Sequence, residues 1–312
     1  MSRAFILALF GVLVICGCGS GGNAVVPSVA PATGTTRPSV TGPGVRLNEA
    51  LTLGDGRKIA ARCLGSGTPT VLLETGGSND MNDWPRDFVD RLAARTTTCL
   101  YSRAGGTGSS APAVRPPTMD SVTSDAVEVL ELAKTKAGVE GPYIWVGWSL
   151  GGSVALAEAL SRPDQTVGVA ILDTDFPADF VRACLADGRS QDDCQAEFDD
   201  DIDAKFMETE IAQAVKPLDV PAVLVTAMTY PECFDSPSAT LSANIAGTTV
   251  VAPDCATLAA AIADKQAADW PAAFPQIKQT RIQADHDGLV RSAGDQIADL
   301  ILAILDDAEA PG

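Results

Sequence analysis

Short apolar runs alternate with longer segments whose apolar residues recur every three or four positions, from about Arg46 onward. The short runs favour buried strands, and the longer pattern favours helices that bury one face. Their alternation predicts an α/β fold with a mostly parallel central sheet flanked by helices. Asp120 and Ser121 are expected to cap one helix, because short polar side chains accept hydrogen bonds from the free amides of a helix start. Strands are predicted at Lys58–Leu64, Thr70–Thr75, Thr97–Ser102, Tyr143–Gly147, Val167–Asp173, Val220–Ala227 and Thr280–Ala284, and helices at Trp84–Arg95, Ser121–Ala137, Leu150–Ser161 and Gly294–Leu305.

A strongly acidic segment with helical periodicity, Asp179–Ala214, separates two of the predicted strands. An insertion that follows a parallel strand lies over the edge of the sheet where the carboxyl ends of the strands meet. We therefore expect a small helical lid over about residues 176–216, within an α/β domain that spans residues 46–308.

The N-terminal residues have the pattern of a targeting segment. Arg3 supplies a positive start, and the apolar run Ala4–Ile15 is too short to span a bilayer comfortably. The run ends in Ile15-Cys16-Gly17-Cys18, which resembles the lipobox of bacterial lipoproteins and fits it better at Cys18 than at Cys16. We expect a signal peptide over residues 1–17, lipid on Cys18, and export to the outer face of a bacterial cell membrane. Secretion as a soluble protein is the alternative. Residues 18–45 are rich in Gly, Pro, Ser and Thr and are expected to form a flexible tether.

The charge and the cysteines limit the possible partners. A net charge of −18 makes nucleic acid an improbable ligand, because phosphates would be repelled. The chain has no CxxC and a single histidine, so the spacing does not suggest zinc. Cleavage before Cys18 would leave six cysteines, which permit fifteen pairings and fit an oxidising compartment. No obligate protein partner is evident.

The strongest chemical signal is Gly147-Trp148-Ser149-Leu150-Gly151, a G-x-S-x-G. An apolar strand, Tyr143–Val146, enters it, and a helical segment leaves it. A strained turn from strand to helix needs small residues on both sides of the serine, and it presents the hydroxyl at the start of the helix. Ser149 is therefore the candidate nucleophile, and the amide of Leu150 is placed to bind an oxyanion.

The histidine is an independent test of this interpretation. His286 is the single histidine of the chain and follows the apolar Thr280-Arg281-Ile282 late in the sequence. Hydrolases with such an elbow carry their base after the nucleophile and after the acid. His286 is therefore the candidate base that removes the proton of Ser149.

With these features in the expected order, residues from about Arg46 to Leu305 resemble the α/β-hydrolases. Leu72-Leu73-Glu74-Thr75-Gly76-Gly77 resembles the family segment that completes the oxyanion hole, and the resemblance makes Gly77 the second oxyanion residue. Thr75 stands where many members have histidine. Tyr101-Ser102-Arg103-Ala104-Gly105 resembles the turn often read as Tyr-Asp-Arg-x-Gly, with Ser102 in place of the acid, and we expect it to be structural.

The third member of the site is the least defined. Many members carry the acid just past the seventh strand, but Tyr230 stands there, with Glu232 and Asp235 slightly further on. Other members, haloalkane dehalogenases among them, carry it at the end of the sixth strand, where Asp173 follows an apolar run. Asp173 is the favoured acid; Asp235, Glu232 and Asp175 remain alternatives.

The resemblance also bears on the cysteines. The second and fourth strands of the family are antiparallel neighbours, so it implies a bridge between Cys63 and Cys99. By position in the same fold, Cys184 would pair with Cys194 within the lid, and Cys233 with Cys255 after the seventh strand.

The sequence thus predicts a serine hydrolase that cleaves ester-like bonds through an acyl-enzyme, with a small-molecule ester or acyl substrate and no metal or organic cofactor. An amidase, peptidase or thioesterase would use the same residues. The rival is a lipid-anchored binding or scaffold protein that kept the fold without catalysis.

Overall fold

A computed structural model describes residues 43–115, 117–174, 217–229, 241–245, 248–268 and 270–309. Several predictions fall outside these residues: the signal peptide, nearly all of the tether, the lid, and the lipidated Cys18. The alternative acids Asp175, Glu232 and Asp235 and the pair Cys184–Cys194 also lie outside, as do Cys233 and the side chain of Cys255.

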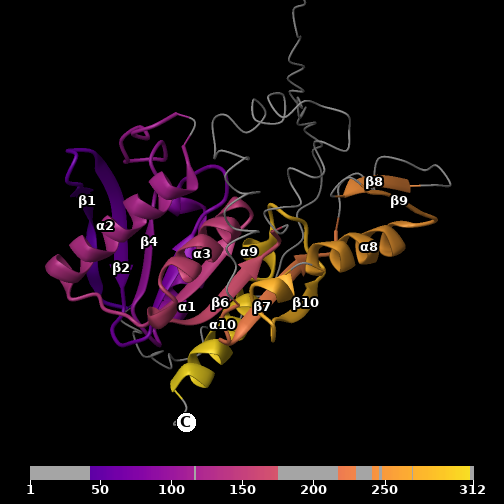
Figure 1. Cartoon of the computed structure of the whole chain (residues 1–312). Coiled ribbons are helices and arrows are strands. Elements are labelled where there is room, and N and C mark those ends of the chain that lie inside the picture. Colours follow the sequence, from indigo (N-terminus) through magenta and orange to yellow (C-terminus); the bar gives the residue numbers. More distant parts are fainter. Residues whose placement is uncertain are drawn as a thin grey trace, which may run out of the picture. The chain divides into compact units, whose positions relative to one another are not determined.

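Eight strands form one mostly parallel sheet in the order β1-β2-β4-β3-β5-β6-β7-β10 (Figure 1). The pairs β1–β2 and β2–β4 are antiparallel, and every following pair is parallel. Each strand predicted from the sequence is present, and β1, which has no predicted counterpart, adds an edge. The strands are β1 Val45–Thr52, β2 Lys58–Leu64, β3 Thr70–Glu74, β4 Thr98–Tyr101, β5 Tyr143–Trp148, β6 Thr166–Leu172, β7 Ala222–Ala227 and β10 Lys278–Ile282.

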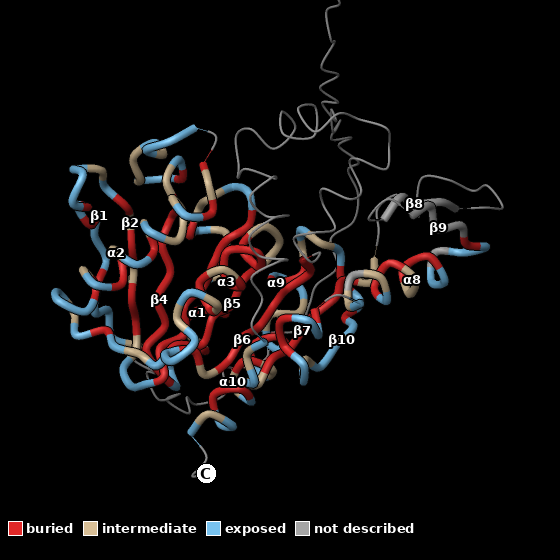
Figure 2. The backbone as a smooth tube through the Cα atoms, in the orientation of Figure 1, coloured by how far each residue is buried: buried red, intermediate tan, exposed pale blue. Residues whose placement is uncertain are grey.

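Helices cover both faces of this sheet, and each face has its own apolar core. On β5, Trp145 packs on the side of α2 and α3, whereas Ile144 and Val146 pack on the side of α1, α9 and α10. This alternation follows from the two-residue repeat of a strand, and it explains why the central strands read as continuous apolar runs. Figure 2 shows the central strands buried along their length. The helices are α1 Arg86–Ala93, α2 Met119–Ala137, α3 Leu150–Ser161, α9 Leu289–Ser292 and α10 Gly294–Glu309.

Helix α2 begins two residues before its predicted start, so the expected caps at Asp120 and Ser121 were wrong. Thr118 is the N-cap: its hydroxyl accepts from the amide of Ser121 at 3.2 Å. The hydroxyl of Ser121 in turn accepts from the amide of Thr118 at 3.0 Å. This reciprocal capping box satisfies two amides, which a single cap at Asp120 would not do.

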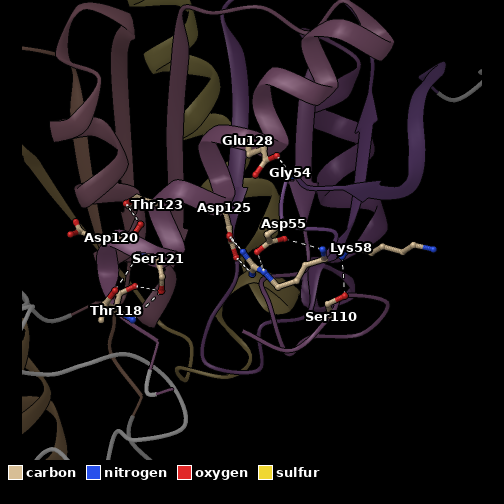
Figure 3. A network of polar contacts seen from close by, with 11 residues as sticks. Gly54, Asp55, Lys58, Ser110, Thr118, Asp120, Ser121, Thr123, Asp125 and Glu128 are labelled. Atoms are coloured by element: carbon tan, nitrogen blue, oxygen red, sulfur yellow. Dashed lines mark hydrogen bonds and ion pairs between the residues drawn. The ribbon is translucent and has the colours of Figure 1, made fainter. Parts of the chain in front are cut away.

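Ion pairs and hydrogen bonds attach α2 to the hairpin of β1 and β2 (Figure 3). The guanidinium of Arg57 donates to both carboxylate oxygens of Asp125 and, through Nε, to Asp55. The amide of Gly54 donates to Glu128, also on α2. These contacts tie the antiparallel edge of the sheet to the helix that covers it.

The stretch after β7 contains more regular structure than the sequence predicted. Strands β8 (Leu241–Ile245) and β9 (Thr248–Ala252) form a small antiparallel pair, and α8 (Cys255–Ala267) follows them. The side chain of Asp254 caps α8 by accepting from the amide of Thr257 at 2.8 Å. Leu258, Ile262 and Ala263 are buried. The sequence predicted no element for these residues.

The structure contains the Cys63–Cys99 disulfide, between directly opposed residues of β2 and β4. The two cysteines are 36 positions apart in the chain. In the chain-entropy account, closing a loop of this length stabilises the folded state by roughly 4 kcal/mol. None of the described helices combines the length and the hydropathy that a bilayer-spanning helix needs.

Candidate active site

Strand β5 ends in a sharp turn that places Ser149 at the start of α3. Ser149 has φ 55° and ψ −130°, a conformation that non-glycine residues rarely adopt, and its amide donates to the carbonyl of Leu172 at 2.9 Å. The glycines on either side are required by close approach. A Cβ on Gly147 would lie 2.1 Å from the carbonyl oxygen of Gly151, and one on Gly151 would lie 2.2 Å from that of Glu74. The G-x-S-x-G pattern thus forms the predicted elbow.

His286 reaches this serine from the loop that follows β10. Its Nε2 lies 3.0 Å from Oγ of Ser149, across 137 positions of sequence. Backbone hydrogen bonds hold the start of the loop against the end of β7: Met228 donates to Ile282 at 2.9 Å and Thr229 to Ala284 at 3.0 Å. The imidazole side chain is 44% exposed, so the site opens to solvent among the described residues.

Asp173 completes the contact from the end of β6. Its Oδ2 lies 2.7 Å from Nδ1 of His286, and its Oδ1 accepts from the amide of Ala227 at 2.9 Å. The residue is 5% exposed and has φ 49°. Its own amide donates to the carbonyl of Val225 at 2.7 Å. Both carboxylate oxygens are therefore engaged, and adjacent strands hold the group in place.

The segment after β3 borders the serine. The position that a Cβ would take on Gly76 lies 3.4 Å from Cβ of Ser149 and 3.9 Å from its Oγ. Gly77 follows on the exposed side, and Leu150 is the first residue of α3. The structure thus brings together the two segments from which the sequence predicted oxyanion donors.

A tryptophan beside the imidazole, and a second one packed on the first, were not singled out from the sequence. The ring of Trp148 lies 5.9 Å from that of His286, and Trp84 packs edge-on to Trp148 at 6.3 Å. Trp84 also stacks on Phe88 at 5.4 Å. The position of Trp148 inside the elbow was the available signal, because the residue before the serine must lie next to the site.

Buried acids lie behind the elbow. Glu74 ends β3 and Glu158 lies on α3, and they are 1% and 0% exposed. Burial raises the pKa of Glu158 well above its usual 4.5, and repulsion from Glu74 raises it further. Burial also raises the pKa of Glu74, against the guanidinium of Arg103, which lowers it. Glu158 is therefore favoured as the neutral acid, while the Glu74 carboxylate faces Arg103.

Within the described residues, no group of three or more His, Cys, Asp or Glu side chains could hold a metal ion. The side chains that converge are instead a hydroxyl, an imidazole and a carboxylate in series. Such a series can move a proton from the hydroxyl to the imidazole, which makes the oxygen a nucleophile.

A relative among characterised proteins matches part of the chain. This chain is 32% identical over 121 residues to "Rhodomycin D methylesterase DauP" of Streptomyces sp. (strain C5). The match covers 36% of this chain and 39% of that enzyme, and a second methylesterase, DnrP of Streptomyces peucetius, matches to the same extent. The chain therefore spans about two fifths of the length of the curated relatives it matches.

Solved structures share the fold along most of the chain. An esterase from Thermogutta terrifontis has a TM-score of 0.54 at 16% identity, covering 85% of this chain and 99% of that one. The enol-lactonase from Burkholderia xenovorans LB400 has a TM-score of 0.53 at 16% identity, covering 82% and 99%. Likenesses at this level of identity establish the fold alone.

The sequence profile of the alpha/beta hydrolase family matches residues 71–308, most of the chain, and it includes the elbow, the carboxylate after β6 and the late histidine. The fold predicted from the sequence is confirmed, and the chain belongs to the α/β-hydrolase family.

Proposed function

We propose that this protein is a carboxylic ester hydrolase that works through a triad of Ser149, His286 and Asp173. The observation that carries the proposal is the continuous series of contacts, 3.0 Å from Oγ to Nε2 and 2.7 Å from Nδ1 to Oδ2. Because the Asp173 carboxylate can only accept, the Nδ1 position carries the proton, and the Nε2 lone pair faces the hydroxyl.

In the proposed reaction, Nε2 of His286 takes the hydroxyl proton as Oγ of Ser149 attacks the ester carbonyl carbon. The carbonyl oxygen becomes an oxyanion, which the amides of Leu150 and Gly77 bind. Collapse breaks the bond to the alcohol oxygen, and that oxygen leaves with the proton from Nε2. Water then gives a proton to Nε2 and attacks the acyl carbon, which releases the carboxylic acid and returns the proton to Ser149.

The proposed substrate class is a carboxylic ester, with neither the acyl part nor the alcohol part specified. The methylesterase relatives support a carboxylic ester, methyl esters included. Amidase, peptidase or thioesterase chemistry would use the same three residues. Turnover of p-nitrophenyl esters of increasing chain length, beside a methyl ester, an anilide and a thioester, ranks these classes.

A fluorophosphonate probe tests the nucleophile. We expect one covalent adduct on Ser149, found by peptide mass spectrometry, and complete loss of the adduct in Ser149→Ala. Ser161→Ala, at the other end of α3, is the matched control and should label like the parent. Labelling that persists in Ser149→Ala would refute the proposed nucleophile, and a folded parent that neither labels nor turns over any ester would favour the non-catalytic scaffold.

We also propose that the protein is exported and held at a membrane by lipid on Cys18, which rests on the lipobox-like Ile15-Cys16-Gly17-Cys18. Several acyl chains on one cysteine are needed for stable anchoring. In a bacterial host, the full chain should enter the detergent phase of a Triton X-114 partition. Cys18→Ser should move to the aqueous phase, whereas Cys16→Ser should not. A Cys18→Ser variant that stays with the detergent would contradict the assignment.

A further inference from the structure

Arg103 is a buried cation that the proposed chemistry does not use. Its side chain is 4% exposed, in the turn after β4 that the sequence marked as structural. Taking a guanidinium out of water costs several kcal/mol unless its donors find partners. The acceptors of the Arg103 hydrogen bonds therefore indicate what the residue does.

All three nitrogens of Arg103 are directed at the segment after β3. Nη1 donates to the carbonyl of Thr75 at 2.6 Å, and Nη2 donates to the carbonyl of Gly76. Nε donates to the side-chain oxygen of Asn79 at 3.0 Å. The Glu74 carboxylate lies 3.4 Å from Nη1 and supplies the countercharge. One planar fork thus holds the backbone of the segment that borders Ser149.

These contacts determine which way the neighbouring amides face. A trans peptide is planar, and its C=O and N–H point in opposite directions. When Arg103 takes the carbonyls of Thr75 and Gly76, the amides of Gly76 and Gly77 must turn away from the guanidinium. The amide of Asn79 also donates to the carbonyl of Gly76, at 3.2 Å, which strengthens the same orientation. The glycine residues themselves restrict these peptide planes less than other residues would, so the hydrogen bonds are needed to hold the planes.

We infer that Arg103 is a positioning residue: it fixes the peptide planes of Thr75–Gly77 so that their amides are oriented in advance for the oxyanion. The inference rests on the proposed hydrolase function and deepens it. It explains why a cation is buried near the elbow although it lies in neither predicted oxyanion segment. A donor that is oriented in advance binds the oxyanion without reorganisation during the reaction.

Arg103→Lys tests the inference, because lysine keeps the charge but cannot donate to two carbonyls in one plane. With p-nitrophenyl acetate we expect kcat to fall by about 10- to 100-fold, with KM changed by less than about threefold. Inhibition by phenylboronic acid, which forms a tetrahedral adduct with the serine, should weaken by a similar factor. A merely structural arginine would lower Tm without this split between kcat and KM.

Arg57→Lys is the matched control, because Arg57 is also paired in the fold but holds α2 rather than the segment at Thr75. It should lower Tm and leave kcat unchanged. If Arg103→Lys does not fold, Asn79→Gly removes the acceptor of Nε while tolerating the φ of 60° at that position, and it should lower kcat about threefold to tenfold.

An unchanged kcat and boronate affinity in the folded variants, with turnover still dependent on Ser149, would overturn the role of Arg103 alone. Turnover that survives Ser149→Ala would overturn the proposed function instead, so the two failures are distinguishable.

Discussion

Replacing His286 with alanine is expected to lower kcat for p-nitrophenyl acetate by about 10⁵- to 10⁶-fold, as in other hydrolases that lose the base of a triad. Nε2 of His286 lies 3.0 Å from the serine oxygen, and the chain has no second histidine to replace it. Without the imidazole, the hydroxyl must lose its proton to water, and no base activates the water that hydrolyses the acyl-enzyme. Steady-state turnover and the rate of fluorophosphonate labelling should fall together.

The control separates chemistry from folding. The His286 side chain is 44% exposed, so its removal should leave Tm within a few degrees of the parent. Asp287→Ala, at the exposed neighbouring position, should retain full activity. A folded His286→Ala enzyme with activity within tenfold of the parent would exclude the imidazole as the base.

Much of the fold and of the candidate site was predictable because the signals are local, or follow from chain order and the family resemblance. The elbow needs glycines on both sides of a serine, and the order of serine and late histidine is a property of the chain. Asp173 was favoured because it directly follows an apolar run at a place where some members of the resembled family carry the acid. The antiparallel pairing that brings Cys63 opposite Cys99 followed from the family's strand order.

What the sequence did not reveal depends on partners that are distant in the chain. Arg103 donates hydrogen bonds to backbone carbonyls 27 and 28 positions away. Because every residue has such a carbonyl, the sequence does not mark which of them accept. The cap at Thr118 was missed because Asp120 and Ser121 offer competing polar side chains in the same turn. Helix α8 is rich in alanine, so its apolar periodicity is weak, and the sequence predicted no element there.

Asp173→Asn is expected to lower kcat by about 10⁴-fold, which corresponds to roughly 5.5 kcal/mol of transition-state stabilisation. The reason is that the Asp173 carboxylate accepts hydrogen bonds from two different donors. Oδ1 takes the amide of Ala227 at 2.9 Å, and Oδ2 faces Nδ1 of His286 at 2.7 Å. Asparagine has a single acceptor oxygen, so its NH₂ group must face one of these two partners.

The amide of Ala227 cannot lose its proton, but the imidazole can move its own from Nδ1 to Nε2. In the Asp173→Asn variant, the side-chain oxygen should therefore stay with Ala227, and the NH₂ group should donate to Nδ1. The proton then sits on Nε2, which can no longer accept the proton of Ser149.

Folding of the Asp173→Asn variant should be little affected, since the replacement has the same shape, and KM should change less than kcat. Asp235→Asn and Glu232→Gln, which replace two of the three alternative acids, should keep nearly full turnover. The assignment fails if Asp173→Asn retains more than a tenth of the activity while one of those two loses it by orders of magnitude.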